Sequence, residues 1–209
     1  MQIEPILRRA PVVPVLTVKD PDQGLRLAEA LVRGGLPVVE ITLRTRAAPE
    51  AIRRIGEALP EAVVGAGTVT TAEQLTRVRD LGARFAVSPG ATDALLAAAS
   101  VSGIPFLPGV STASESMRAL AAGFRYQKFF PAEACGGIAF LRSLAAPLPE
   151  ARFCPTGGVS AANAGDYLAC PNVVCVGGSW VAPADAVASG DWARIERLAR
   201  EASALGAAR

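Results

Sequence analysis

Hydrophobic and polar positions follow two different periods along this chain. Short apolar runs rich in β-branched residues indicate strands, and the segments between them repeat apolar residues at helical spacing. Eight apolar runs follow one another at intervals of about 20 to 27 residues. They cover residues 12–16, 37–42, 62–67, 84–88, 105–110, 126–131, 152–158 and 173–179.

Repeated strand–helix units predict parallel strands that are covered by helices. Eight such units can close into a (β/α)8 TIM barrel or lie open as a doubly wound sheet. We favour the barrel, because no G-x-G-x-x-G follows the first strand and polar residues end several strands. Residues 1–10 are expected to form a short helix that plugs the barrel bottom. No linker is visible, so the sequence predicts one α/β domain over residues 1–209.

Composition and charge exclude several classes of partner. The chain has 209 residues, 51% of them hydrophobic, which is enough for one substantial core. A net charge of +2 without runs of like charge leaves no footprint for nucleic acid or a membrane surface. No apolar stretch reaches the roughly 20 residues of a membrane span. The N-terminus lacks a small-residue cleavage site, so we expect a cytoplasmic protein.

The chain contains no histidine, which narrows its chemistry. Zinc sites built with histidine and Ser-His or Cys-His nucleophiles are excluded. The four cysteines, Cys135, Cys154, Cys170 and Cys175, form no C-x-x-C pair. We therefore expect reduced, mostly buried thiols and no metal site. Cys154 and Cys175 would face the helix layer from neighbouring strands.

Only two amines are available as nucleophiles, because 19 of the 21 basic residues are arginines and the other two are Lys19 and Lys128. Lys19 lies in the polar segment TVKDPDQG and is expected to be a solvated loop residue. Lys128 lies in the sixth strand, YQKFFP, where side-chain alternation places it on one face with Tyr126 and Phe130. In the second strand the apolar neighbours suit the helix layer, which turns Glu40 inward.

Strands two and six lie opposite each other in an eight-stranded barrel, so Glu40 and Lys128 should meet near the C-terminal strand ends. Two interpretations stay open. The pair is either a structural ion bridge or a base beside a nucleophile. Aromatic neighbours remove water from the amine and favour its neutral, nucleophilic form, whereas a nearby carboxylate favours the charged form.

Glycine pairs follow strands seven and eight, in PTGGVS (155–160) and VGGSW (176–180). Each leads toward a helix start and exposes backbone N–H groups where many barrels hold phosphate, although one such pair alone also serves a tight turn. Thr156 and Ser179 add hydroxyl donors. In GAGTV (65–69), Thr68 stands beside two glycines that would let a ligand approach the backbone. Arg44 is suited to hold a carboxylate, or to form a salt bridge at the rim.

Seven motifs occur in order and together resemble one family. They are VVEITLRT, GAGTV, SPG, PGVST, KFFPAE, CPTGG and VGGSW, between Pro11 and about Arg200. The resemblance is to the 2-keto-3-deoxy-6-phosphogluconate (KDPG) aldolases of the Entner–Doudoroff pathway, which also act on 4-hydroxy-2-oxoglutarate. It implies cleavage of a phosphorylated 2-keto-3-deoxy sugar acid to pyruvate and glyceraldehyde 3-phosphate, without metal or cofactor, by a homotrimer.

The resemblance also implies roles for particular residues. Lys128 would form the Schiff base and Glu40 would transfer protons. Arg44 and Thr68 would hold the pyruvate carboxylate, and Pro89 and Phe130 would form the pocket wall. The residues implied to bind phosphate are Thr156, Gly157, Gly158, Gly178 and Ser179.

Three alternatives remain beside this interpretation. One keeps the chemistry with another substrate, 4-hydroxy-2-oxoglutarate or the phosphogalactonate analogue. The second is a phosphate-binding barrel isomerase or synthase in which Lys128 makes only an ion pair. The third is a catalytically silent barrel, which would be expected to break the pair of Glu40 and Lys128. Imine trapping separates the aldolases from the others.

Overall fold

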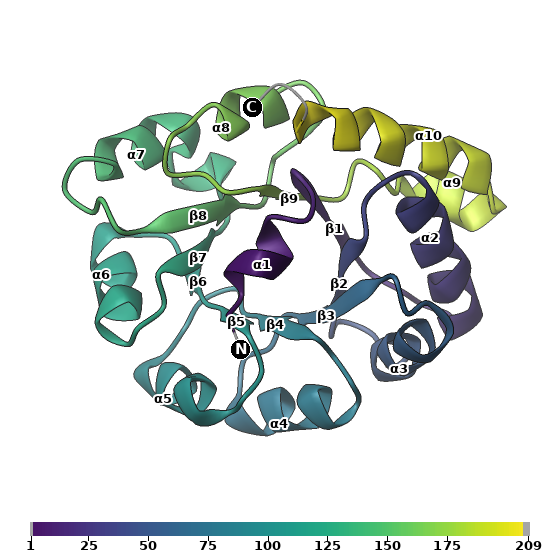
Figure 1. The fold of residues 1–209 in the computed structure, drawn as a ribbon, viewed down its shortest axis with the longest axis horizontal. Helices are drawn as coiled ribbons and strands as arrows, with labels where there is room; N and C mark the ends of the chain where they lie inside the picture. The colour runs from purple at the N-terminus through teal and green to yellow at the C-terminus, as the bar shows by residue number, and fades with distance from the viewer. Residues whose placement is uncertain (1, 207–209) are drawn as a thin grey trace.

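The computed structural model describes residues 2–206 and places parallel strands inside a layer of helices (Figure 1). The strands are β1 (Val12–Leu16), β2 (Val38–Thr42), β3 (Val63–Gly67), β4 (Phe85–Val87), β5 (Phe106–Leu107), β6 (Gly109–Val110), β7 (Tyr126–Phe129), β8 (Arg152–Pro155) and β9 (Val176–Gly178). They form a six-stranded sheet in the order β5-β4-β3-β2-β1-β9 and a three-stranded sheet in the order β6-β7-β8.

The predicted helical segments are confirmed. The helices are α1 (Glu4–Leu7), α2 (Pro21–Arg33), α3 (Ala48–Ala58), α4 (Ala72–Asp80), α5 (Asp93–Val101), α6 (Ala113–Ala121), α7 (Gly137–Leu144), α8 (Ala164–Leu168), α9 (Ala184–Ser189) and α10 (Trp192–Ser203), with 3-10 turns η1 (Glu133–Cys135) and η2 (Ala204–Gly206). Side-chain caps fix several starts: Asp20, for example, accepts from the N–H of Gln23. Within residues 2–206, no helix has both the length and the apolar character needed to cross a membrane.

The strands do not form one continuous eight-stranded ladder. The predicted strand at 105–110 is divided at Pro108, so that β5 pairs with β4 and β6 pairs with β7. Proline has no backbone N–H, and the ladder changes partner where that donor is missing. Between β8 and β9, two isolated bridges, Phe153–Val173 and Thr156–Gly177, stand in place of a regular ladder. The observed architecture is an α/β fold with two parallel sheets, which surround α1 in Figure 1.

Two apolar clusters hold these layers together. The larger lies between strands and helices and contains Val39 and Ile41 of β2. The smaller lies inside the strands, where Ile6 and Leu7 of α1 join residues of β1 to β4. The expected plugging helix is therefore present at residues 4–7. Since side chains alternate along a strand, both clusters follow from the sequence pattern.

The expected orientation of two cysteines was wrong. Cys154 and Cys175 belong to the inner cluster with Val13 and Phe85, not to the helix layer. The strand register gives the reason for Cys154, since it is the direct partner of Lys128, and paired residues on neighbouring strands share a face.

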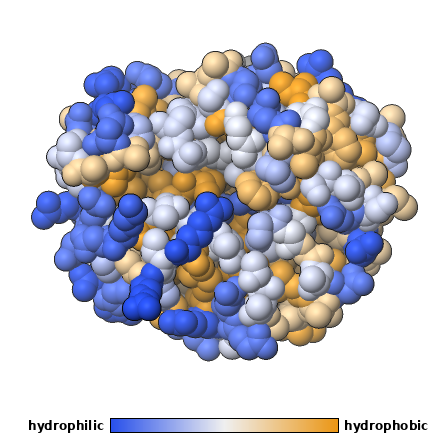
Figure 2. Space-filling model, turned by 180° about the vertical axis from the view of Figure 1, so that it is seen from behind, coloured by the Kyte–Doolittle hydropathy of each residue, from blue (hydrophilic) through white to orange (hydrophobic). Residues whose placement is uncertain are grey.

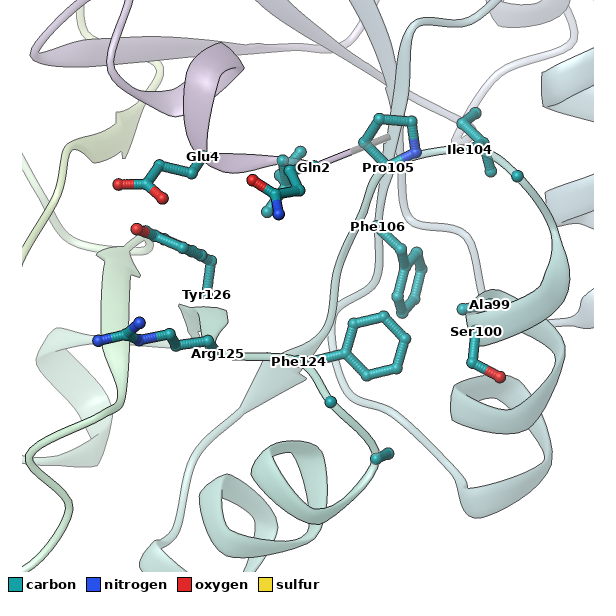
Figure 3. A pocket seen from close by; sticks show the side chains of 14 residues that line it. Gln2, Glu4, Ala99, Ser100, Ile104, Pro105, Phe106, Phe124, Arg125 and Tyr126 are labelled. Carbon is teal, nitrogen blue, oxygen red and sulfur yellow. The ribbon is translucent and has the colours of Figure 1, made fainter.

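A cavity of about 480 Å³ opens between α1 and the starts of β5 and β7 (Figure 3). Glu4 and Tyr126 line one side of it, and Phe106 and Phe124 meet edge to face on the other. Neither Lys128 nor Glu40 lines this cavity. Parallel-barrel active sites are built at the other strand ends, so we do not assign the catalytic site here.

Candidate active site

The centre of the site is the contact between Lys128 on β7 and Glu40 on β2. The Lys128 ammonium nitrogen, Nζ, lies 3.0 Å from Oε1 and 3.3 Å from Oε2 of Glu40. Both residues are only 4% exposed. The predicted meeting of these two side chains is thus confirmed, because alternation turns both of them away from the helices and toward the interior.

This ion pair is buried at a cost. Removing two charges from water costs several kcal/mol per ion, which mutual attraction repays only in good geometry. The ring of Phe130 lies beside the amine, with its centroid 5.4 Å from Lys128 Nζ. A separation of 3.0 Å between amine and carboxylate also allows a proton to pass directly from one to the other. The arrangement can therefore produce a neutral amine without changing the total charge of the pair.

Glycines of β3 make room for this pair. A Cβ on Gly67 would lie 2.1 Å from Glu40 Oε1, and a Cβ on Gly65 would lie 2.4 Å from the ring of Phe85. The side chains of Glu40 and Phe85 therefore take the space that we expected the GAG glycines to leave for a ligand. Close packing against these two side chains accounts for the glycines of the motif GAGTV.

Next to Gly67, Thr68 adopts a left-handed backbone with φ of 62°, which is rare for a β-branched residue. Its hydroxyl accepts a hydrogen bond from Nε of Arg44, at 3.3 Å. Arg44 is exposed after β2, so its remaining donors face solvent at the strand ends. The structure thus places Arg44 in contact with Thr68, which follows directly after Gly67, the glycine that packs against Glu40.

The two glycine-containing loops after β8 and β9 also lie side by side. Thr156 forms a bridge with Gly177, and a Cβ on Gly177 would lie 2.3 Å from Thr156 Oγ1. Gly157 and Gly158 have φ of 97° and 81°, which only glycine adopts easily. Ser179 is exposed at the end of β9. The Ser179 hydroxyl and the glycine backbone therefore converge where the sequence predicts phosphate donors, whereas the Thr156 hydroxyl is buried and donates to the carbonyl of Cys154 at 3.3 Å.

In the loop of residues 156–158, the carbonyl groups and the N–H groups differ in their hydrogen bonding. The carbonyl oxygens of Thr156, Gly157 and Gly158 accept from Ala132 N, Glu133 N and Asn163 Nδ2 at 2.8, 3.0 and 3.2 Å. Within the described part of the chain, the N–H group of Gly158 donates to no protein acceptor, whereas the bridge between Thr156 and Gly177 turns the N–H group of Gly157 toward the carbonyl of Gly177. The loop is thus anchored by its acceptors and leaves the Gly158 donor open, as an anion-binding loop requires.

The expected helix starts are not at these loops. Helix α8 begins at Ala164 and α9 begins at Ala184, several residues after Gly158 and Ser179. Turns fill the intervening segments. The left-handed conformations of Gly157 and Gly158 do not lead directly into a helix, and Gly177 and Gly178 still belong to strand β9. The backbone donors of the loops themselves, not helix ends, are the available anion-binding groups.

The other predicted residues lie around this centre. A Cβ on Gly109, the strand partner of Lys128, would lie 2.2 Å from the carbonyl carbon of Pro89. Pro89 therefore lies beside Gly109 of β6, the residue that pairs with Lys128. Lys19, the other lysine, is exposed between β1 and α2. A Cβ on Gly178 would overlap the ring of Trp180, so this indole covers the second loop.

Sequence analysis missed one polar contact near Glu40. The hydroxyl groups of Thr17 and Thr42 lie 3.1 Å apart, and Thr42 also donates to the carbonyl of Leu16 at 2.9 Å. The available signal was a polar residue that directly follows the first strand.

No group of three His, Cys, Asp or Glu side chains suited to a metal ion occurs within residues 2–206. Figure 2 shows that the face opposite α1 mixes hydrophobic and hydrophilic residues across its middle.

Comparisons with known proteins agree on one family. Residues 3–198 match the aldolase family described as KDPG and KHG aldolase. The 2-dehydro-3-deoxy-phosphogluconate aldolase of Dickeya dadantii (strain 3937) is 54% identical over 201 residues, which are 96% of this chain and 94% of that protein.

Two solved structures are also closely similar. One is a KDPG aldolase from Legionella pneumophila with pyruvate captured at low pH as a covalent carbinolamine intermediate, with a TM-score of 0.95 and 44% identity, covering 97% of this chain and 98% of that one. The other is the 2-keto-3-deoxy-6-phosphogluconate aldolase of Zymomonas mobilis ZM4 with 3-phosphoglycerate, with a TM-score of 0.92 and 47% identity, covering 97% of this chain and 95% of that one.

Proposed function

This chain belongs to the KDPG and KHG aldolase family, and on that premise we propose that it cleaves 2-dehydro-3-deoxy-6-phosphogluconate into pyruvate and glyceraldehyde 3-phosphate. The single observation that carries the proposal is the buried contact of 3.0 Å between Lys128 Nζ and Glu40 Oε1. It supplies a nucleophile and a proton acceptor within direct reach of each other. The family is one of carbon–carbon lyases, and we propose the metal-independent, cofactor-free, Schiff-base class for this member.

The reaction begins when Lys128 passes a proton to Glu40 and its neutral amine attacks the C2 ketone. The bond from nitrogen to C2 forms, and a proton moves from that nitrogen to the carbonyl oxygen to give a hydroxyl. Glu40 then returns the proton it took from Lys128 to this hydroxyl, which leaves as water, so that a protonated imine and the Glu40 carboxylate remain. The C3–C4 bond then breaks, and its electron pair moves toward the positive nitrogen to give an enamine. Cleavage therefore needs a cation at nitrogen, which an imine of Lys128 provides.

Glu40 serves both directions of proton transfer. As its carboxylate it accepts the C4 hydroxyl proton, directly or through water, while the aldehyde is released. As its acid it returns a proton to C3 of the enamine, and hydrolysis of the imine then frees pyruvate and Lys128. One carboxylate suffices, since each proton accepted in the first half is given back in the second.

The two ends of the substrate would be held by different groups. Arg44 and Thr68 would bind the carboxylate beside C2, supported by their mutual contact at 3.3 Å next to Gly67. Pro89 and Phe130 would wall the reacting carbons. We propose a phosphate site made of Thr156, Gly157, Gly158, Gly178 and Ser179, which is supported by the open N–H group of Gly158, the exposed Ser179 and the contact between the two loops. The 3-phosphoglycerate in the Zymomonas relative is a ligand of the same chemical kind.

A second substrate is favoured by the family description, which names KHG as well as KDPG aldolases. We therefore include 4-hydroxy-2-oxoglutarate cleavage as the alternative activity. The imine chemistry at Lys128 is the same for both substrates, and only the phosphate site distinguishes them. The phosphogalactonate analogue remains a further candidate that the same assay tests.

Borohydride trapping tests the proposal directly. Pyruvate with borohydride should leave one reduced adduct on Lys128, located by peptide mass spectrometry. Lys19 is the internal control, since it is the other lysine and is exposed in a loop. Lys128→Arg keeps the charge and should abolish both adduct and cleavage. An adduct on Lys19, or cleavage that depends on an added divalent metal after chelation, would contradict the proposal.

The same proposal extends to the whole chain. We propose that residues 1–209 form one catalytic domain whose two sheets act as a closed (β/α)8 barrel, that three copies assemble, and that the enzyme works in the cytoplasm on small molecules, with no nucleic-acid or membrane partner. The bridges between β8 and β9 support closure, and the family resemblance supports the trimer. Light scattering should give three times the mass of the chain.

A further inference from the structure

A second carboxylate lies next to the proposed phosphate site. Glu133 of η1 packs against the loop after β8, because a Cβ on Gly158 would lie 2.4 Å from Glu133 Cγ. Its backbone N–H donates to the carbonyl of Gly157 at 3.0 Å. A negative charge is thus built directly beside the open N–H group of Gly158, which we propose to bind a phosphate dianion. The Glu133 carboxylate and a bound phosphate would repel each other, so phosphate binding depends on which way the carboxylate points.

Tyr167 determines that direction. Its ring is fully buried in α8, and its hydroxyl donates a hydrogen bond to Oε1 of Glu133. Burial and this bond to Glu133 raise the pKa of Tyr167, so that the hydroxyl keeps its proton and remains a donor. Gly137 gives the pair its space, since a Cβ there would lie 3.1 Å from the hydroxyl and 3.4 Å from Glu133 Oε1.

We propose that Tyr167 is a positioning residue for phosphate recognition: it holds the Glu133 carboxylate away from the open N–H group of Gly158. Without the hydroxyl, Glu133 becomes an intramolecular anion that competes with the phosphate of the substrate for this donor. The inference rests on the proposed function, because it assigns a determinant to the same phosphate site. It concerns binding of the phosphate end and leaves the imine end, at Lys128, unchanged.

The test compares binding with catalysis in matched variants. Tyr167→Phe keeps the buried ring and removes only the hydroxyl. We expect calorimetric affinity for 3-phosphoglycerate to fall roughly tenfold, as for one lost hydrogen bond to a charged group. KM for the phosphorylated substrate should rise by a similar factor while kcat stays within about twofold. Cleavage of 4-hydroxy-2-oxoglutarate should not change, since it carries no phosphate.

A second substitution separates charge competition from packing. Adding Glu133→Gln to Tyr167→Phe removes the competing charge and should restore most of the affinity for 3-phosphoglycerate. A merely structural role predicts the opposite, because the double variant loses more native contacts than the single one. Tyr126→Phe is the matched control. That tyrosine also lies against a glutamate, Glu4, but at the cavity on the α1 side of the fold (Figure 3), and its removal should leave both substrates unaffected.

The outcomes distinguish this inference from the proposed function. An unchanged affinity in Tyr167→Phe, an equal loss for both substrates, or no restoration in the double variant overturns the role of Tyr167, even when the wild type cleaves the phosphorylated substrate. A wild type that traps no pyruvate on Lys128 overturns the proposed function instead. A wild type that traps pyruvate but binds no 3-phosphoglycerate overturns the phosphate site and this inference together.

Discussion

Gly67 of β3 lies against the carboxylate of Glu40 on β2, so closely that a Cβ on the glycine would stand 2.1 Å from Glu40 Oε1. Real side-chain contacts are not this short, so the missing side chain is what lets Glu40 extend toward Lys128. A backbone position without a catalytic group therefore controls the geometry of the proposed active site.

Gly67→Ala is expected to displace Glu40 and to break its contact with Lys128. Small misplacements of reacting groups cost about 100-fold in rate, so turnover should fall by at least that factor. Gly56→Ala is the control. Gly56 lies in helix α3, and its new Cβ would make only an ordinary contact with Val64 Cγ1, at 3.7 Å. It should keep full turnover and raise the free energy of unfolding by about 0.5–1 kcal/mol. Equal turnover in both variants would refute the spacing role of Gly67.

Glu40→Gln should separate imine formation from proton transfer. The amide preserves the shape but accepts no proton at neutral pH, so kcat should fall about 10² to 10⁴-fold. Pyruvate should still be trapped on Lys128 by borohydride, although more slowly. Steady-state kinetics and peptide mapping measure the two effects. Near-normal turnover would mean that Glu40 is only the structural partner of Lys128.

Ser179→Ala should affect the phosphorylated substrate selectively. Losing one hydroxyl donor to a charged oxygen costs about 1.5 to 3 kcal/mol, which is roughly tenfold to a hundredfold in kcat/KM. Cleavage of 4-hydroxy-2-oxoglutarate should change little, and imine trapping should be normal. Parallel kinetics with both substrates check this. Equal losses would assign Ser179 to the fold, and a wild-type preference for 4-hydroxy-2-oxoglutarate would make the alternative activity the main one.

Stability at alkaline pH should depend on Tyr167. Its pKa is raised in the folded state by burial and by Glu133, whereas an unfolded tyrosine has a pKa of about 10. The folded state then holds this proton more tightly, so the stabilisation is complete below pH 10 and is lost as pH rises toward the folded pKa. The slope is at most about 1.4 kcal/mol per pH unit for one proton.

Tyr167→Phe removes this titrating group, so its free energy of unfolding should fall less steeply above pH 10 than that of the wild type. Urea unfolding at several pH values measures the difference. Tyr126 also has a raised pKa, through burial first and Glu4 second, and its contribution is common to both proteins. Identical slopes would show that the pKa of Tyr167 is not raised in the folded protein.

The sequence by itself determined the elements and the chemistry available to them. Strand and helix periods are local, so the alternation of strands and helices could be predicted from neighbouring residues alone. Parity placed Glu40 and Lys128 on inward faces, and the absence of histidine left carboxylates, lysine, tyrosine, cysteine or a cofactor as the sources of reactivity. The meeting of the pair needed one further assumption, that strands two and six face each other.

Tertiary structure decided what depends on contacts between distant segments. The ladder changes partner at Pro108, where β5 pairs with β4 and β6 with β7, and only packing decides which strands lie on its two sides. Gly67 is explained by a side chain on another strand, and the bond from Tyr167 to Glu133 joins residues 34 positions apart with no periodic relation. Periodicity states which way a side chain points but not what it meets, because that depends on how closely the backbones approach after packing.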